Sequence, residues 1–508
     1  MPSLQFPSAV RRAAGGLRDA FVVSPARERN VALALLLYAV VWAVYGAIAK
    51  GPQGLHPDMT ELIAWSRELA WGYAKHGPVA AVLAWAWFSV LPVAEWSYYL
   101  LAMLMPAAAL WIMWRLSADY LDIEKRVAGV ALMTFVPFFN FHALKYNVNT
   151  VLLPMWALTA WWFLRAYERQ SVFYAALAGL AAAAAMMTKY WSVFLLAGLV
   201  VAALTDTRRA RYFRSPAPWV TVLAGLALLA PHLIWLTQHD YAPFSYAITV
   251  HGEDTFLANV KSAFGYLGGS LGYVAVPVVV VLLMVRPDRA TLAEMVWPRS
   301  PSRRLVATAF WAPFLLPVVA ALAGLVEITS LWSMSAFALL LMLLLSPEAA
   351  KVSPVHTGRI LVAATVFPLV MLIAAPFIAV AGQRKGPPPA SALAARLAAR
   401  VEHDWHALTP KPLRYVGGPE DLAYGVAAYA ADRPRSLPNL PQPSAATLKR
   451  DGAVFVCFAA DMGCRQNAGR QAARLGASHL TTFTLARTYL GVEGRPQNYA
   501  VRLVPPER

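Results

Sequence analysis

Runs of about twenty apolar residues recur along the chain, and they constrain its fold more than any other feature. A helix needs about 20 residues to cross the roughly 30 Å of hydrocarbon in a bilayer. Hydrophobic residues occupy 59% of the 508 positions and charged residues only 14%, whereas an ordinary soluble domain is about 25% charged. The sequence therefore predicts an all-α protein that crosses a membrane many times.

About eleven segments are expected to cross the membrane. The stretch 172–204 is too long for one crossing, and Thr188-Lys189-Tyr190 interrupts it, so two spans joined by a tight turn are predicted there. The expected spans are 30–49, 94–115, 127–141, 150–165, 172–187, 190–204, 218–237, 267–285, 305–325, 329–346 and 359–381.

Lysine and arginine are unequally distributed over the two sets of loops. With the N-terminal segment 1–29 in the cytoplasm, the inside segments carry 21 of these residues and the outside loops carry six. Cytoplasmic loops are enriched in them, so this orientation in a bacterial inner membrane is predicted. It places the long loops 50–93 and 238–266, and the C-terminus, on the periplasmic side. The net charge of +17 is thus a property of topology, and nucleic acid is not expected as a partner.

The composition changes after the last span. Residues 382–389 form a Pro/Gly linker between the membrane domain 30–381 and the segment 390–508, which is predicted to be a small periplasmic α/β domain. Strands are expected at 413–418, 452–459 and 499–505, and helices at 390–408, 421–432 and 469–477. Cys457 and Cys464 are expected to form a disulfide if the compartment is oxidising; the alternative is two free thiols, with Cys457 buried in an apolar strand.

The first outside loop holds the densest polar stretch of the membrane domain. Its residues 58–74 are predicted to form an interfacial helix with Asp58, Glu61 and Glu68 on a polar face directed to water. Tryptophans 65, 71, 85, 87 and 96 are interpreted mainly as interfacial belt residues. Further polar side chains are expected on the same side of the membrane: Lys75, His76, Lys145, Asn147, Asn149, Lys189, Tyr190, His239 and Asp240.

This set of residues suits transfer at a phosphate-linked centre. A carboxylate can accept a proton from an attacking hydroxyl group, and lysine and histidine can stabilise a leaving phosphate. Simpler structural explanations exist for each residue: a helix N-cap for Asp58, a snorkelling lysine for Lys189 and a solvated face for Glu61. The remaining structural explanations are helix capping for Lys145, Asn147 and Asn149, loop packing for His76, and a surface turn for His239 and Asp240.

The first-loop pattern P-D-x6-W-S-R-x-L-x-x-G-Y-x-x-H-x-P, from Pro57 to Pro78, resembles bacterial glycosyltransferases of family 39. These are relatives of protein O-mannosyltransferases and of the lipid A aminoarabinose transferase. Three further segments match in order: KYNVNTVLLPMWALTAWWFLRA (145–166), GLAAAAAMMTKYWSVFLL (179–196) and APHLIWLTQHDYAPFSY (230–246). The resemblance covers residues 30–260 and continues beyond them only in architecture.

The resemblance implies the GT-C fold, a polyprenyl-phosphate sugar donor and inversion at the anomeric carbon. It implies that Asp58 is the general base, because the family's first-loop aspartate matches it. The sequence departs from the family pattern at Met59, where an acid is common, and at asparagines 147 and 149, where relatives often carry an acid. It also departs at Lys75, because the family's loop often ends in D-H-P-P and only His76 and Pro78 match. Glu61 is a candidate replacement for the acid missing at Met59. A divalent metal is compatible with this chemistry, but no ligand motif implies one.

The expected function is therefore transfer of a sugar from a polyprenyl phosphate to a periplasmic acceptor, either lipid A or its core oligosaccharide, or another glycan, lipid or protein. A transporter or flippase of a lipid-linked saccharide is the rival. Transporters place polar groups and broken helices near the bilayer midplane, whereas the spans here are nearly free of charge. A non-catalytic scaffold on the same fold is a third reading.

Overall fold

The computed structural model describes residues 8–251, 255–386, 393–439 and 441–507, without the side chains of 248–251. The chain forms two compact units. Unit 1 comprises Met1–Ala43, Lys75–Val79 and Leu100–Val370, and unit 2 comprises Val44–Ala74, Ala80–Tyr99 and Met371–Arg508. Most of the first loop thus belongs to the same unit as the C-terminal domain. Residues 387–389 of the predicted linker, and residues 252–254 of the predicted loop 238–266, lie outside the described residues.

Six helices in the described part of the chain are long and apolar enough to cross a membrane. Each coincides with a predicted span, although α13 begins eleven residues earlier than expected. They are α2 (Arg27–Ala49), α5 (Glu95–Ser117), α11 (Ala217–Gln238), α13 (Phe256–Val285), α15 (Pro301–Leu322) and α17 (Pro354–Lys385).

The remaining helices of unit 1 are shorter or less apolar. The predicted break at Lys189 is confirmed, because α8 ends at Thr188 and α9 begins at Val193 after a 3-10 turn. These helices are α1 (Ser8–Arg18), α6 (Ile123–Met133), α7 (Val148–Arg169), α8 (Val172–Thr188), α9 (Val193–Thr205), α10 (Arg209–Phe213), α12 (Ala242–His251), α14 (Arg289–Val296) and α16 (Leu340–Leu345).

Two expected spans are not continuous helices. In 127–141, α6 ends at Met133 and a 3-10 turn begins at Pro137, because proline lacks the amide that a continuing helix would need. In 329–346, two 3-10 turns precede the short α16. There the Ser333 hydroxyl donates to the Ser330 carbonyl at 2.7 Å, a local bond of the kind that competes with a regular helix.

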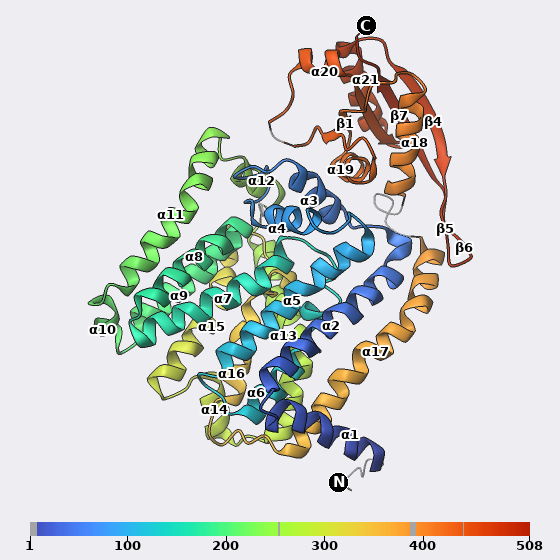
Figure 1. Ribbon diagram of the computed structural model, residues 1–508. Helices are drawn as coiled ribbons and strands as arrows, with labels where there is room; N and C mark the ends of the chain where they lie inside the picture. Colours follow the sequence, from blue (N-terminus) through green and yellow to red (C-terminus); the bar gives the residue numbers. More distant parts are fainter. Residues whose placement is uncertain (1–7, 252–254, 387–392, 440, 508) are drawn as a thin grey trace. The chain divides into compact units, whose positions relative to one another are not determined.

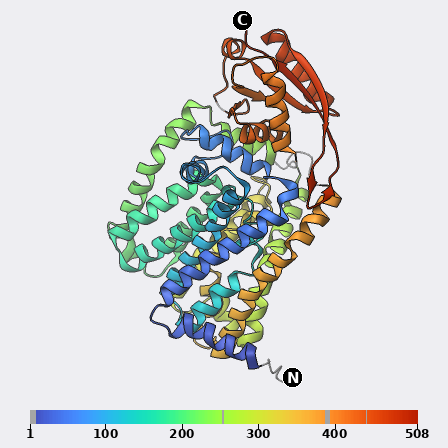
Figure 2. The ribbon, with the colours of Figure 1, turned by 45° about the vertical axis from the view of Figure 1, so that its right-hand side comes forward.

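Small residues allow close packing of helices within unit 1. Helices α7, α8, α9 and α11 run side by side (Figures 1 and 2). At the α8–α11 crossing, a Cβ atom on Gly179 would lie 2.2 Å from the Thr221 carbonyl oxygen. At the α9–α15 crossing, one on Gly198 would lie 2.3 Å from Pro313. Such small residues are typical of helix interfaces in membranes, where backbones approach closely.

Unit 2 contains two first-loop helices and a five-stranded sheet of order β2-β1-β3-β7-β4. In this sheet β2, β1 and β3 are parallel, and β3, β7 and β4 are antiparallel. The helices are α3 (Pro57–Arg67), α4 (Val79–Phe88), α18 (Ala394–His406), α19 (Glu420–Tyr429), α20 (Ala445–Asp451) and α21 (Met462–Leu475). The strands are β1 (Tyr415–Gly417), β2 (Arg435–Ser436), β3 (Ala453–Phe458), β4 (His479–Leu485), β5 (Thr488–Tyr489), β6 (Val492–Glu493) and β7 (Gln497–Val504).

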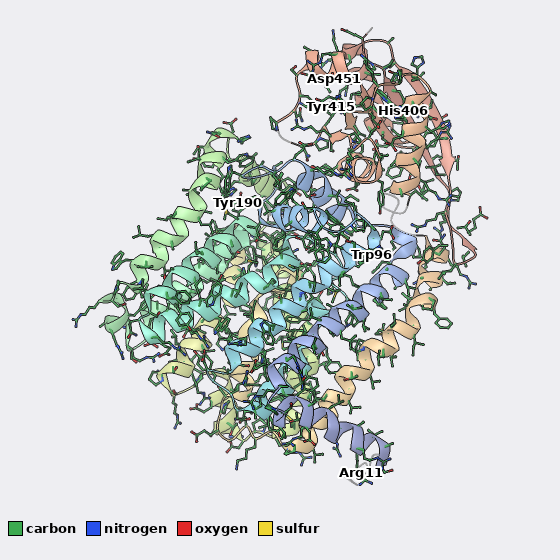
Figure 3. The ribbon with its side chains drawn as sticks, in the orientation of Figure 1. Arg11, Trp96, Tyr190, His406, Tyr415 and Asp451 are labelled. Atoms are coloured by element: carbon green, nitrogen blue, oxygen red, sulfur yellow. A yellow bond between two sulfur atoms is a disulfide. The ribbon has the colours of Figure 1, made fainter. Side chains whose placement is uncertain are left out.

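One core cluster of the C-terminal domain lies between this sheet and helices α18 and α19, and a second lies between the sheet and α21. Buried side chains from α18 and α19, among them Leu397, Trp405 and Val426, pack with Val454 and Val501 of β3 and β7. His406 ends α18, as Figure 3 shows. Cys457 of β3 and Cys464 of α21 form a disulfide. The predicted α/β domain is therefore present, with β4 as an additional edge strand.

Candidate active site

Asp58 lies in the first turn of α3, where a negative charge is favoured by the exposed backbone amides. The helix begins at Pro57, and the N-cap residue is His56, whose Nδ1 accepts a hydrogen bond from the Asp58 amide at 3.1 Å. The cap is therefore His56, and the structural alternative that Asp58 is itself the N-cap is wrong. The Asp58 side chain is 39% exposed, so its carboxylate is accessible.

His56 is a candidate site residue that the sequence analysis did not single out. Its Nδ1 also lies 3.2 Å from Asp58 Oδ1. A neutral imidazole with its proton on Nε2 accepts from the amide, whereas an imidazolium donates from Nδ1 to the carboxylate. Nδ1 can thus accept from the Asp58 amide or, when it carries a proton, donate to the Asp58 carboxylate, but it cannot do both at once. A histidine directly before Pro-Asp at a helix start was the available signal.

Most of the rest of α3 is not exposed to solvent. All residues from Met59 to Ser66 are buried, and Glu61 is only 8% exposed. Trp65 is 2% exposed and therefore cannot be an interfacial belt residue, whereas Trp71 and Trp96 are about half exposed. The prediction of an interfacial helix with a polar face directed to water is thus wrong, because Met59–Ser66 are buried in protein over two turns of α3.

In unit 1, the turn between α8 and α9 brings Lys189 to Asn149. Lys189 Nζ donates to Asn149 Oδ1 at 2.9 Å and lies 4.3 Å from the centre of the Trp332 ring. Asn149 stands in the first turn of α7, after the N-cap residue Asn147, whose Oδ1 accepts from the amides of residues 149 and 150. The Lys145 carbonyl accepts from Thr150 Oγ1 at 2.7 Å. Capping is thus a structural role of Asn147, while Asn149 orients a cation.

Tyr190, labelled in Figure 3, is the first residue of the 3-10 helix in this turn. Its hydroxyl is 2.9 Å from Nε2 of His232, a residue of α11 that is only 1% exposed. At the C-cap of α11, the His239 ring stacks on Trp235, with its Nδ1 2.9 Å from the carbonyl of the same tryptophan. Asp240 follows in a left-handed backbone conformation with φ of 50°. Unit 1 therefore contains several of the predicted polar site residues, and it brings Asn149 and Lys189 into direct contact.

The end of the first loop approaches α8 closely. A Cβ atom on Gly77 would lie 2.2 Å from the Met187 carbonyl oxygen, so only glycine fits at this position. This contact places the segment with Lys75 and His76 against the end of α8, two residues before Lys189. Lys75 Nζ lies 5.5 Å from the Tyr246 ring centre. Within the described ranges, no group of three or more His, Cys, Asp or Glu side chains could hold a metal ion.

Comparisons with known proteins agree with this architecture. Residues 75–235 match the model of the family described as dolichyl-phosphate-mannose-protein mannosyltransferase. The fold is similar to that of ArnT from Cupriavidus metallidurans bound to undecaprenyl phosphate, with a TM-score of 0.57, 12% identity, and 94% of this chain and 98% of that chain covered. ArnT from the same organism in the apo state gives a TM-score of 0.58, 13% identity, and coverage of 92% and 97%. No curated protein matches the chain by sequence.

The chain is therefore a membrane protein with the GT-C fold and a small C-terminal strand-containing domain. Its residues 75–235 are similar in sequence to a mannosyltransferase family.

Proposed function

We propose that the protein is a polyprenyl-phosphate-sugar-dependent glycosyltransferase of the inner membrane, with its N-terminus in the cytoplasm and its reaction on the periplasmic side. The acceptor is a cell-envelope molecule: lipid A, the lipopolysaccharide core, or another glycan, lipid or protein. The observation that carries the proposal is the accessible Asp58 carboxylate in the first turn of α3. It stands in the Pro-Asp motif by which the sequence resembles family 39.

In this reaction Asp58 accepts the proton of an acceptor hydroxyl as its oxygen attacks the anomeric carbon of the donor sugar. A new carbon–oxygen bond forms on the face opposite the phosphate, and the bond between the anomeric carbon and the phosphate oxygen breaks. Polyprenyl phosphate leaves with the electron pair of that bond, and the sugar configuration is inverted. Because the phosphate is a good leaving group, the scheme needs no separate general acid.

Lys189 is the residue that we assign to the donor phosphate. Its hydrogen bond to Asn149 and its position over Trp332 fix the ammonium group of a long, otherwise mobile side chain. A preoriented cation stabilises the charge that develops on a leaving phosphate. The further residues that we propose to bind substrate are His76, Lys75, Tyr190, His239 and Asp240. Lys145 and Asn147, at the capped start of α7, are proposed in the same group. Glu61 is proposed in this group from the sequence alone.

The test is mass spectrometry of envelope glycans and lipid A from cells that carry the wild-type protein, Asp58→Asn or no protein. We expect a sugar modification that requires the wild-type protein and is absent with Asp58→Asn. Asp451→Asn is the matched control, because Asp451 pairs with Arg450 on the surface of α20. A modification that persists with Asp58→Asn contradicts the assignment. Movement of a lipid-linked saccharide between leaflets without sugar transfer would instead indicate the transporter function.

A further inference from the structure

We propose that the C-terminal domain positions the helix that carries Asp58, through a clamp formed by Trp65, Arg67 and Glu68 of the first loop with residues of α19 and the segment after it. The proposal rests on the proposed role of Asp58 as the base. These clamp residues are positioning residues, and they and their clamp partners belong to unit 2.

Arg67, at the C-terminal end of α3, binds the C-terminal end of α19. Its guanidinium donates to the carbonyl oxygens of Ala427 and, at 3.0 Å, of Ala428. These carbonyls belong to the last turn of α19, where backbone acceptors lack partners within the helix and a cation is favoured. A planar guanidinium can serve two such acceptors at once, which a lysine ammonium cannot do in the same geometry.

Trp65 extends the clamp beyond α19. Its indole Nε1 donates to Asn439 Oδ1 at 3.0 Å. The same indole stacks on the Tyr73 ring, with centres 4.5 Å apart and planes 3° from parallel. The Tyr73 hydroxyl lies 3.0 Å from the Trp65 carbonyl oxygen, so the turn after α3 folds back on this side chain. Trp65 therefore links the loop to the C-terminal domain across more than 370 residues of chain.

Glu68, the residue after α3, forms an ion pair with Arg435, with Oε2 and Nε 2.8 Å apart. Arg435 belongs to β2, which pairs in parallel with β1 at Tyr415. The ion pair thus ties the end of α3 directly to the edge of the sheet. The interpretation of Glu68 as a solvated surface residue is wrong for this reason.

The start of α3 is held as well. The amide of Leu55 donates to the hydroxyl of Tyr429, the last residue of α19, at 3.4 Å. That hydroxyl also lies 3.2 Å from Glu95 Oε1. One residue after Asp58, the Met59 carbonyl accepts from the Tyr98 hydroxyl at 3.0 Å. Both ends of the helix and the backbone beside Asp58 are therefore fixed within unit 2.

A clamp of this kind is needed because α3 has only 11 residues. Helices shorter than about 12 residues are marginal without tertiary contacts. A displacement of about 1 Å in a catalytic group can cost roughly 100-fold in rate. Loosening the clamp should therefore lower the rate of the chemical step and leave donor binding largely unchanged.

The experiment uses full-length protein in nanodiscs and compares Arg67→Ala and Asn439→Ala with wild type. Arg450→Ala is the matched control, because it removes an arginine from the surface of the same domain. We expect amide hydrogen exchange in residues 57–67 to become about tenfold faster in both clamp variants, as expected for loss of one or two hydrogen bonds. Exchange in β3 and β7 should stay at its wild-type rate. Unchanged exchange in residues 57–67 of both variants would overturn the proposal.

Activity is the second readout. With an undecaprenyl-phosphate-linked sugar that wild-type protein turns over, kcat of Arg67→Ala should fall roughly 10- to 100-fold, with little change in KM for the donor. Arg67→Lys should recover part of that loss. An equal fall of kcat in Arg450→Ala would also contradict the clamp. If Asp58→Asn stays active while both clamp variants show faster exchange, the proposed base is wrong and the clamp stands.

Discussion

Replacing Gly77 by alanine tests the close approach between the end of the first loop and α8. The added Cβ atom would lie 2.2 Å from the Met187 carbonyl oxygen and 2.7 Å from Met187 Cα. These are backbone atoms of a packed helix, so the backbone itself must move. Overpacking of this kind costs about 1–3 kcal/mol or more. We therefore expect Gly77→Ala to lower the free energy of unfolding by roughly 2–3 kcal/mol.

The same substitution should weaken binding of a lipid phosphate. Met187 lies two residues before Lys189, whose hydrogen bond to Asn149 is 2.9 Å long. A hydrogen bond to a charged group contributes about 1.5–3 kcal/mol, so losing its geometry should reduce affinity roughly 10- to 100-fold. The assay is thermal unfolding of purified protein in detergent, with and without undecaprenyl phosphate.

Gly268→Ala is the matched control. Gly268 lies within α13, and an added Cβ atom there meets nothing within 4 Å. Alanine is favoured over glycine inside a helix by about 1 kcal/mol, so this variant should be slightly more stable than wild type and should bind undecaprenyl phosphate equally well. Wild-type stability and wild-type affinity in Gly77→Ala would mean that the loop end does not pack tightly against α8.

Three further substitutions have distinct expected outcomes. Burial raises the pKa of Glu68 above its ordinary value of 4.5, and the charge of Arg435 lowers it by less. A carboxyl group whose pKa is raised in the folded state stabilises the fold fully below its unfolded pKa. This contribution is lost as the pH rises through the folded-state pKa. The unfolding temperature of Glu68→Gln minus that of wild type should therefore increase from pH 4 to pH 7, and a flat difference would contradict this. Lys189→Gln, measured by the shift that undecaprenyl phosphate causes in thermal unfolding, should bind the lipid at least about tenfold more weakly, and equal shifts would remove the phosphate role. Cys464→Ser opens the short disulfide loop and should cost about 2–3 kcal/mol in thermal unfolding under oxidising conditions, whereas no loss would mean that the disulfide does not stabilise the domain.

The sequence predicted the membrane class, the break at Lys189 and the α/β domain because each depends on local pattern. Windows of about 20 residues are enough to show an apolar run of spanning length, a charged residue between two such runs, or a short strand pattern. Asn149 and Lys189 were both candidates, although nothing in the sequence showed that their side chains bond.

The environment of α3 could not be predicted in the same way. Its partners Asn439, Arg435 and α19 lie some 360 residues later in the chain. Without them, a short helix with three acidic or basic residues is naturally placed at a membrane surface. Trp65 and Glu68 were misassigned for the same reason, because burial by a distant domain leaves no local periodic signal. His56 was missed because histidine is an uncommon N-cap residue.

The role of Asp58 as general base is tested by a single-turnover measurement on purified protein in proteoliposomes loaded with an undecaprenyl-phosphate-linked sugar and acceptor. Release of undecaprenyl phosphate and appearance of glycosylated acceptor are followed together in wild type and Asp58→Asn. Removing a general base typically costs about 10²–10⁴-fold in rate, so we predict that loss in the chemical step, with undecaprenyl phosphate binding unchanged. Turnover of Asp58→Asn at the wild-type rate would mean that Asp58 is not the general base.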